Sequence, residues 1–151
     1  IDAGIIFHLL RETGLDEDEI EEILNRESGL LGISGLSNDM RRIINKASTG
    51  DDRCELAIEM FVYRIKKYIG SYFAAMNGLD TLIFTAGIGE NSPKVRSLIC
   101  ENMDSLGIDI DEEANKKEVE GIISSDKSDV KVMVIPTDEG KMISIDAEEL
   151  I

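Results

Sequence analysis

The sequence has 151 residues and a formal net charge of −15, with 42% hydrophobic and 31% charged residues. This length and hydrophobic content predict a single folded domain over residues 1–151 and exclude an intrinsically disordered chain. The excess of carboxylates argues against a nucleic-acid partner, because affinity for a phosphate backbone depends largely on Lys and Arg. No apolar run approaches the ~18 residues that span a bilayer, so we expect no membrane partner.

The sequence contains two cysteines, Cys54 and Cys100, which are far apart and form no C-x-x-C motif. A chain of this length does not need a disulfide to stabilise its core. We therefore expect two reduced thiols and a cytoplasmic location.

The N-terminal third predicts short helices. Apolar residues at helical spacing predict a first helix that stops at Gly14, followed by a very acidic helix over 16–22. The only histidine, His8, lies on the first helix, and we expect it to be a core or boundary residue rather than a catalyst. Residues 28–35, with the sequence SGLLGISG, predict a Gly/Ser loop.

The next segment predicts a helix capped by Ser37 or Asn38 and then the longest helix of the chain, over 51–76. Apolar residues of this long helix form one continuous stripe with a period of 3.6 residues. We therefore expect it to form the centre of the core.

The second half predicts strands over 81–85, 121–124 and 130–135, with a helix between the first two. That helix begins at Ser92-Pro93 and continues to Gly107. Thr137 is expected to cap a final helix that reaches the end of the chain. Helices dominate and strands come late, so the sequence predicts a mixed α/β fold.

A glycine-rich segment directly follows the first predicted strand, in the order Ala86, Gly87, Ile88, Gly89, Glu90 and Asn91. Glycines let a backbone approach a ligand closely, and the N–H groups at the start of the next helix are free to bind an anion. This is a suitable place for a nucleotide, but the segment matches neither complete phosphate-binding fingerprint. The alternative is a tight turn with no ligand.

Two polar motifs offer further candidates. Asp39, at a predicted helix start, could accept hydrogen bonds from ribose hydroxyls, and Arg41 could lie against a purine ring. Glu139 follows the last strand, where it could hold Mg²⁺ together with phosphate oxygens and water. The alternatives are a helix cap with a surface arginine, and an acidic residue in a first helical turn.

Taken in order, three motifs resemble the acetate kinase (acetokinase) family: SNDMR at 37–41, FTAGIGENSP at 84–93 and IPTDE at 135–139. The resemblance runs from Asp2 to the end of the chain. It implies an acetate-and-sugar-kinase/actin-like (ribonuclease H-like) lobe with a mixed sheet packed by helices. It also implies that this chain corresponds to the C-terminal, nucleotide-side lobe of a two-lobe, homodimeric enzyme that phosphorylates acetate with ATP.

The resemblance also implies roles for individual residues. Residues 39–41 (Asp39, Met40 and Arg41) would line the adenosine pocket. Residues 87–91 (Gly87, Ile88, Gly89, Glu90 and Asn91) would face the nucleotide, and Glu139 would be associated with Mg²⁺, or with Mn²⁺ in its place. One departure is Gly140, where family members usually carry a glutamate.

The family's acetate pocket, transition-state histidine and catalytic arginines belong to sequence that precedes Asp2, so we expect no catalytic residue in this chain and no activity from it alone. Acetate cannot be separated from propionate or butyrate here, because the acyl pocket lies in that preceding sequence. A further alternative is a non-catalytic nucleotide-binding or dimerisation module.

Overall fold

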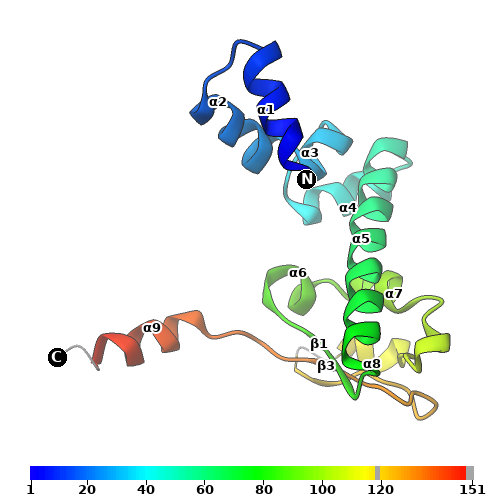
Figure 1. The fold of residues 1–151 in the computed structure, drawn as a ribbon. Helices are drawn as coiled ribbons and strands as arrows, with labels where there is room; N and C mark the ends of the chain where they lie inside the picture. The colour runs from blue at the N-terminus through cyan, green and yellow to red at the C-terminus, as the bar shows by residue number, and fades with distance from the viewer. Residues whose placement is uncertain (118–119, 149–151) are drawn as a thin grey trace. The chain divides into compact units, whose positions relative to one another are not determined.

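A computed structural model describes residues 1–117 and 120–148. The chain divides into two compact units, residues 1–61 and 62–151 (Figure 1). This division does not test whether the two units fold as one domain, so the single domain expected over residues 1–151 stays a prediction. Within the described residues, no helix combines the length and the apolar character needed to cross a membrane.

The first unit is entirely helical in its described elements, as the sequence predicts. Its elements are α1(Ala3–Glu12), α2(Glu17–Glu22), the π-helical turn η1(Ile23–Glu27), α3(Gly29–Ser34), α4(Met40–Ala47) and the first part of α5(Asp52–Met76). Asp16 and Glu19 form a reciprocal capping box at the start of α2. The core or boundary position predicted for His8 is wrong, because His8 is exposed on α1.

The loop predicted over 28–35 is also wrong, because most of this segment forms α3. Its aliphatic side chains are partly buried, and this packing outweighs the entropic cost of its glycines. The helix ends at Gly35, which has a left-handed φ of 66°. Arg53 Nε donates a hydrogen bond to the carbonyl oxygen of Ile33 at 2.9 Å and so caps the C-terminal end of α3.

The core of the first unit lies along α4 and the start of α5. Its buried apolar residues on these helices are Met40, Ile43, Ala47, Cys54, Ala57 and Ile58. Both cysteines of the chain are free thiols, as expected. The cap of α4 is Asp39 rather than the predicted Ser37 or Asn38; its carboxylate accepts from the N–H of Arg41.

The prediction that α5 is a core helix along its whole length is confirmed only for its first half. Further along, Tyr68, Tyr72 and Met76 are 54%, 60% and 58% exposed, and the two tyrosine rings stack with their centroids 6.4 Å apart. Apolar spacing shows which face of a helix can be buried, but not whether another element covers that face.

The second unit contains a three-stranded mixed sheet in the order β1-β3-β2. Strands β1(Thr81–Phe84) and β3(Lys131–Val134) are parallel, and β2(Gly121–Ile122) runs antiparallel to β3. Val132 and Val134 in the central strand are fully buried. The three predicted strands and the mixed α/β class are therefore confirmed.

Helices of the second unit differ from the prediction at their ends. They are α6(Ala86–Asn91), α7(Pro93–Cys100), the 3-10 turn η2(Asp104–Leu106), α8(Glu112–Lys117) and α9(Glu139–Glu148). The helix predicted from Ser92 to Gly107 stops at Cys100, and Asn102 then adopts a left-handed φ of 56°. Helix α8, which the sequence analysis did not predict, is short and is capped by the Asp111 carboxylate.

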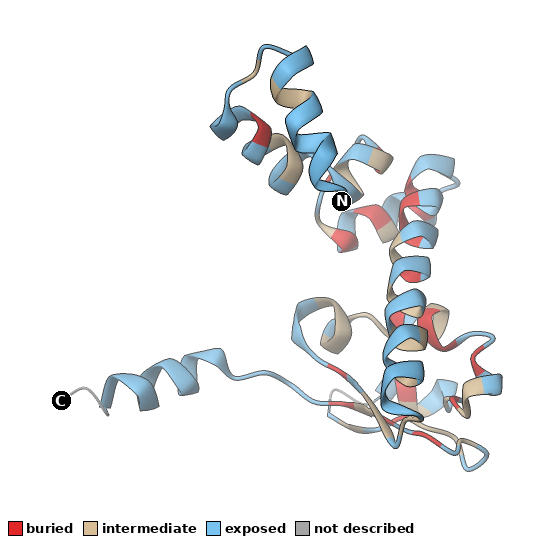
Figure 2. Cartoon of the chain, viewed as in Figure 1, coloured by how far each residue is buried: buried red, intermediate tan, exposed pale blue. Residues whose placement is uncertain are grey.

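The last described helix, α9, starts one residue later than predicted. Asp138, not Thr137, acts as its cap, because the Asp138 carboxylate accepts from the N–H of Lys141 at 3.0 Å. None of its residues is buried, and Figure 2 shows α9 exposed along its length. Residues 149–151 of the predicted helix lie outside the described residues.

Candidate functional site

The glycine-rich segment lies where the sequence places it, directly after β1, but it is a helical turn rather than a loop. Thr85 is extended with a φ of −148°, and Ala86, the first residue of α6, has a left-handed φ of 58°. A left-handed alanine costs about 1–2 kcal/mol, so the surrounding structure must stabilise this sharp reversal.

The two glycines of α6 differ in their surroundings. A Cβ atom added at Gly87 would meet no atom within 4 Å, whereas one at Gly89 would lie 3.3 Å from the carbonyl carbon of Phe84. Gly89 is therefore needed for close packing of α6 against the end of β1. Packing among the described residues gives no reason for a glycine at position 87, and the open side of Gly87 is free for another molecule to approach.

The polar side chains of α6 are engaged within the chain. One carboxylate oxygen of Glu90, Oε1, accepts from the N–H of Thr137 at 2.8 Å and from its hydroxyl at 3.0 Å. The N–H of Thr137 lowers the pKa of the Glu90 carboxyl. Asn91 Nδ2 donates to the carbonyl oxygen of Gly87 at 2.9 Å, and Ile88 is half-buried. Asn91 therefore stabilises the turn itself, whereas Glu90 joins the turn to the segment after β3.

Arg96 on α7 holds the other side of this turn, and sequence reasoning missed it. It is 1% exposed, and its Nη1 donates to the carbonyl oxygens of Gly89 and Glu90 at 2.7 and 2.8 Å. Its Nε and Nη2 each donate to Asn115, which is fully buried, at 2.7 Å. A cation here satisfies the free carbonyls at the C-terminal end of α6. No motif signals this role, because Arg96 sits among apolar positions that face inward.

Asp39, Met40 and Arg41 lie together in the first unit, at the start of α4. The Asp39 carboxylate accepts from Arg41 Nε at 3.1 Å and Nη2 at 2.7 Å. The side-chain hydrogen bond from Arg41 lowers the pKa of Asp39 to about 2. The Arg41 side chain is 86% exposed, so its guanidinium plane remains open to a ligand. Met40 is 3% exposed, and its side chain belongs to the core.

Glu139 is the first residue of α9 and is exposed. The Glu90–Thr137 hydrogen bonds bring the segment that leads to Glu139 against α6. Among residues 1–117 and 120–148, no three His, Cys, Asp or Glu side chains gather as a metal site would require. Mg²⁺ takes carboxylate oxygens together with phosphate oxygens and water, and Glu139 offers one exposed carboxylate of this kind.

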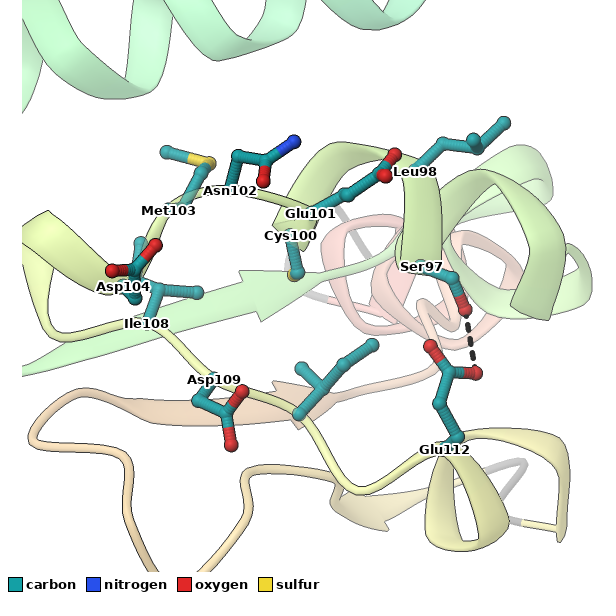
Figure 3. Close-up of a pocket in the computed structure, with 11 residues that line it drawn as sticks. Ser97, Leu98, Cys100, Glu101, Asn102, Met103, Asp104, Ile108, Asp109 and Glu112 are labelled. Carbon is teal, nitrogen blue, oxygen red and sulfur yellow. Dashed lines mark hydrogen bonds between the residues drawn. The ribbon is translucent and has the colours of Figure 1, made fainter.

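A hollow of about 400 Å³ lies in the second unit beside α7 (Figure 3). Its acidic lining residues are Glu101, Asp104, Asp109 and Glu112. Ser97 donates a hydrogen bond to Glu112 at 2.8 Å across one end of it. The lining contains no lysine or arginine, so this hollow does not suit the phosphates of a nucleotide.

Comparison with known proteins places this arrangement in one family. The sequence pattern of the acetokinase family matches residues 1–145. The chain is 44% identical over 151 residues to acetate kinase from Heliobacterium modesticaldum and 51% identical over 154 residues to that from Fervidobacterium nodosum. In both comparisons it is covered completely and spans 38% of the relative.

Solved structures give the same result. The crystal structure of Porphyromonas gingivalis acetate kinase matches with a TM-score of 0.87 and 43% identity, over 97% of this chain and 37% of that one. A propionate kinase from Francisella tularensis matches with a TM-score of 0.85 and 42% identity, over 95% of this chain and 36% of that one. The actin-like fold class expected from the sequence is confirmed, and the chain belongs to the acetokinase family.

Proposed function

We propose that this chain forms the nucleotide-side lobe of an acetate kinase, which transfers the γ-phosphoryl group of ATP reversibly to acetate and gives acetyl phosphate and ADP. The observation that carries the proposal is the 44–51% identity to acetate kinases across the whole chain. A non-catalytic nucleotide-binding or dimerisation module is the alternative that an activity assay would reveal.

In this proposal the start of α4 binds the adenosine. The exposed guanidinium of Arg41 would stack on the purine, and its ion pair with Asp39 fixes the plane in which it lies. A carboxylate has about four acceptor positions, so Asp39 can still accept from a ribose hydroxyl. Because the Met40 side chain is buried, its contribution would come from its backbone.

The glycine turn α6 would approach the nucleotide at Gly87, where no atom of the chain occupies the space of a side chain. Ile88, Gly89, Glu90 and Asn91 complete this turn. Glu139 would contact Mg²⁺, or Mn²⁺, which offsets negative charge on the phosphate oxygens when it is bound.

Phosphoryl transfer to acetate also needs an acetate pocket and cationic groups around the transferred phosphoryl group. We assign none of these to this chain, so the chain alone should bind MgADP or MgATP weakly and should not catalyse transfer. We further propose a homodimer and a cytoplasmic location, on the resemblance to the family and the free thiols.

Propionate is the second candidate acceptor, because a propionate kinase matches this chain nearly as well as an acetate kinase does. The test is an acyl-phosphate trapping assay with hydroxylamine on the natural protein that carries this sequence. Its kcat/KM should be highest for acetate among acetate, propionate and butyrate. A higher value for propionate or butyrate would reassign the acceptor, and no acyl phosphate from any of the three would contradict the kinase proposal.

A further inference from the structure

Glu90 presents a problem for the proposed site. A free carboxylate beside the phosphates of a nucleotide would repel them. The structure instead occupies this carboxylate with two donors of Thr137, its backbone N–H at 2.8 Å and its hydroxyl at 3.0 Å. The two residues are 47 positions apart, so these bonds join two distant segments of the second unit.

The backbone of Glu90 is fixed independently of its side chain. Arg96 Nη1 donates to its carbonyl oxygen at 2.8 Å, and the same guanidinium is held by Asn115 through two bonds of 2.7 Å. Asn115 Nδ2 in turn donates to Pro93 O at 3.0 Å. The backbone of Glu90 is therefore held by buried side chains, and its carboxylate reaches an exposed segment.

That exposed segment is anchored at its start, where the N–H of Ile135 donates to the carbonyl oxygen of Phe84 at 2.9 Å. Residues 135–140 are exposed, and α9 has no buried residue. Glu139 lies two positions after Thr137, so its placement relative to α6 depends on what holds Thr137. Among the hydrogen bonds of the described residues, the two that Thr137 donates to Glu90 are the ones that tie Thr137 itself to another element.

We propose that Glu90 is a positioning residue that acts through Thr137, holding the segment that carries Glu139 against the glycine turn. The inference rests on the proposed nucleotide site and assigns Glu90 a role different from nucleotide contact. The Arg96–Asn115 pair fixes the backbone of Glu90. The Glu90 carboxylate then holds Thr137 in place by accepting its two hydrogen bonds.

A double-mutant cycle on the natural protein distinguishes positioning from direct contact. Glu90→Ala removes both hydrogen bonds and should raise the Kd for MgADP about tenfold, as expected for losing hydrogen bonds to a charged group. Thr137→Ala removes only the hydroxyl bond and should raise it less, about threefold. The double variant should match Glu90→Ala, because the hydroxyl has no acceptor once the carboxylate is gone.

Two further variants complete the design. Glu90→Gln keeps an acceptor for the Thr137 N–H and should restore most of the affinity, while Glu120→Ala removes an exposed carboxylate elsewhere in the same unit and should leave the Kd unchanged. Hydrogen exchange without nucleotide provides a readout independent of binding. The amides of residues 137–139 should exchange faster in Glu90→Ala and at the wild-type rate in Glu120→Ala.

The possible failures are separable. If the wild-type protein binds MgADP but the two losses add, or if Thr137→Ala has no effect, Glu90 does not act through Thr137 and the inference is overturned alone. Unchanged exchange at 137–139 in Glu90→Ala would overturn it as well. If the wild-type protein binds no MgADP, the proposed function fails and the inference fails with it.

Discussion

Replacing each glycine of α6 by alanine tests whether this turn serves packing or a ligand. At Gly87 an added Cβ meets nothing within 4 Å, and the residue is not among those with positive φ. Alanine should therefore stabilise the turn by about 0.5–1 kcal/mol through its higher helix propensity. At Gly89 the added Cβ would lie 3.3 Å from the Phe84 carbonyl carbon. Such overpacking should cost about 1–3 kcal/mol.

The two variants should separate stability from binding. Denaturant unfolding of the natural protein should show Gly87→Ala as stable as the wild type or more so, and Gly89→Ala as less stable. Binding of MgADP, measured by calorimetry, should nevertheless weaken at least about tenfold in Gly87→Ala, which corresponds to about 1.4 kcal/mol. Wild-type affinity in Gly87→Ala would refute close approach of the nucleotide at this residue.

Four further predictions concern the start of α4 and the start of α9. Arg41→Ala should raise the KM for ATP more than the KM for acetate in steady-state assays; an equal rise would count against an adenosine role. The Asp39 carboxyl should titrate near pH 2 by carbon-13 NMR, and in Arg41→Ala its pKa should rise yet stay below 3.8, because the N–H of residue 41 still donates. The stabilisation from this lowered pKa is complete above pH 3.8 and is lost as the pH falls toward about 2; an Asp39 midpoint at its ordinary value would contradict the ion pair. Glu139→Gln should lower turnover and raise the Mg²⁺ concentration needed for half-maximal activity, and an unchanged Mg²⁺ dependence would leave Glu139 as a helix-start residue only. Gly140→Glu should raise amide protection in α9 by roughly 0.5–1 kcal/mol without moving the global unfolding midpoint, because the helix is exposed throughout; reduced protection would show that position 140 needs glycine.

The structure gives a different physical reason for the stabilisation expected from Gly140→Glu than the sequence does. With Thr137 as the predicted cap, Gly140 would take the third helical position, where a capping box normally carries Glu or Gln. Asp138 is the actual cap, so Lys141 takes the third helical position and Gly140 does not interrupt a box. What remains is the helix propensity and the favourable placement of a glutamate in a first turn.

Local patterns predicted the elements whose signal is contained in a few neighbouring residues. The strands around Phe84 and Val134 are continuous apolar runs, and Ser92-Pro93 begins a helix through a cap and a fixed φ. The loop prediction over 28–35 was wrong because glycine and serine together dominate the composition of this segment, whereas partial burial and the Arg53 cap decide its conformation. Burial depends on contacts that are distant in sequence and therefore could not be read from the segment itself.

The same distinction applies to the candidate site. Motif spacing identified Gly87, Gly89 and Glu139 as candidates, since a strand followed by glycines and an acidic residue after a strand are local signals. It missed Arg96, whose role depends on contacts with Asn115, 19 positions away. The family resemblance placed Glu90 against the nucleotide, which stays a prediction, and spacing could not show its hydrogen bonds with Thr137, 47 positions away.

The most direct test of the proposed function is hydrogen exchange of the natural protein with and without MgADP, resolved to individual peptides. We expect slower exchange over residues 39–41 and 86–91 when MgADP is present, with little change beside the acidic hollow at residues 101–109. Unchanged exchange in both segments at saturating MgADP would contradict the assignment of the nucleotide site to this chain.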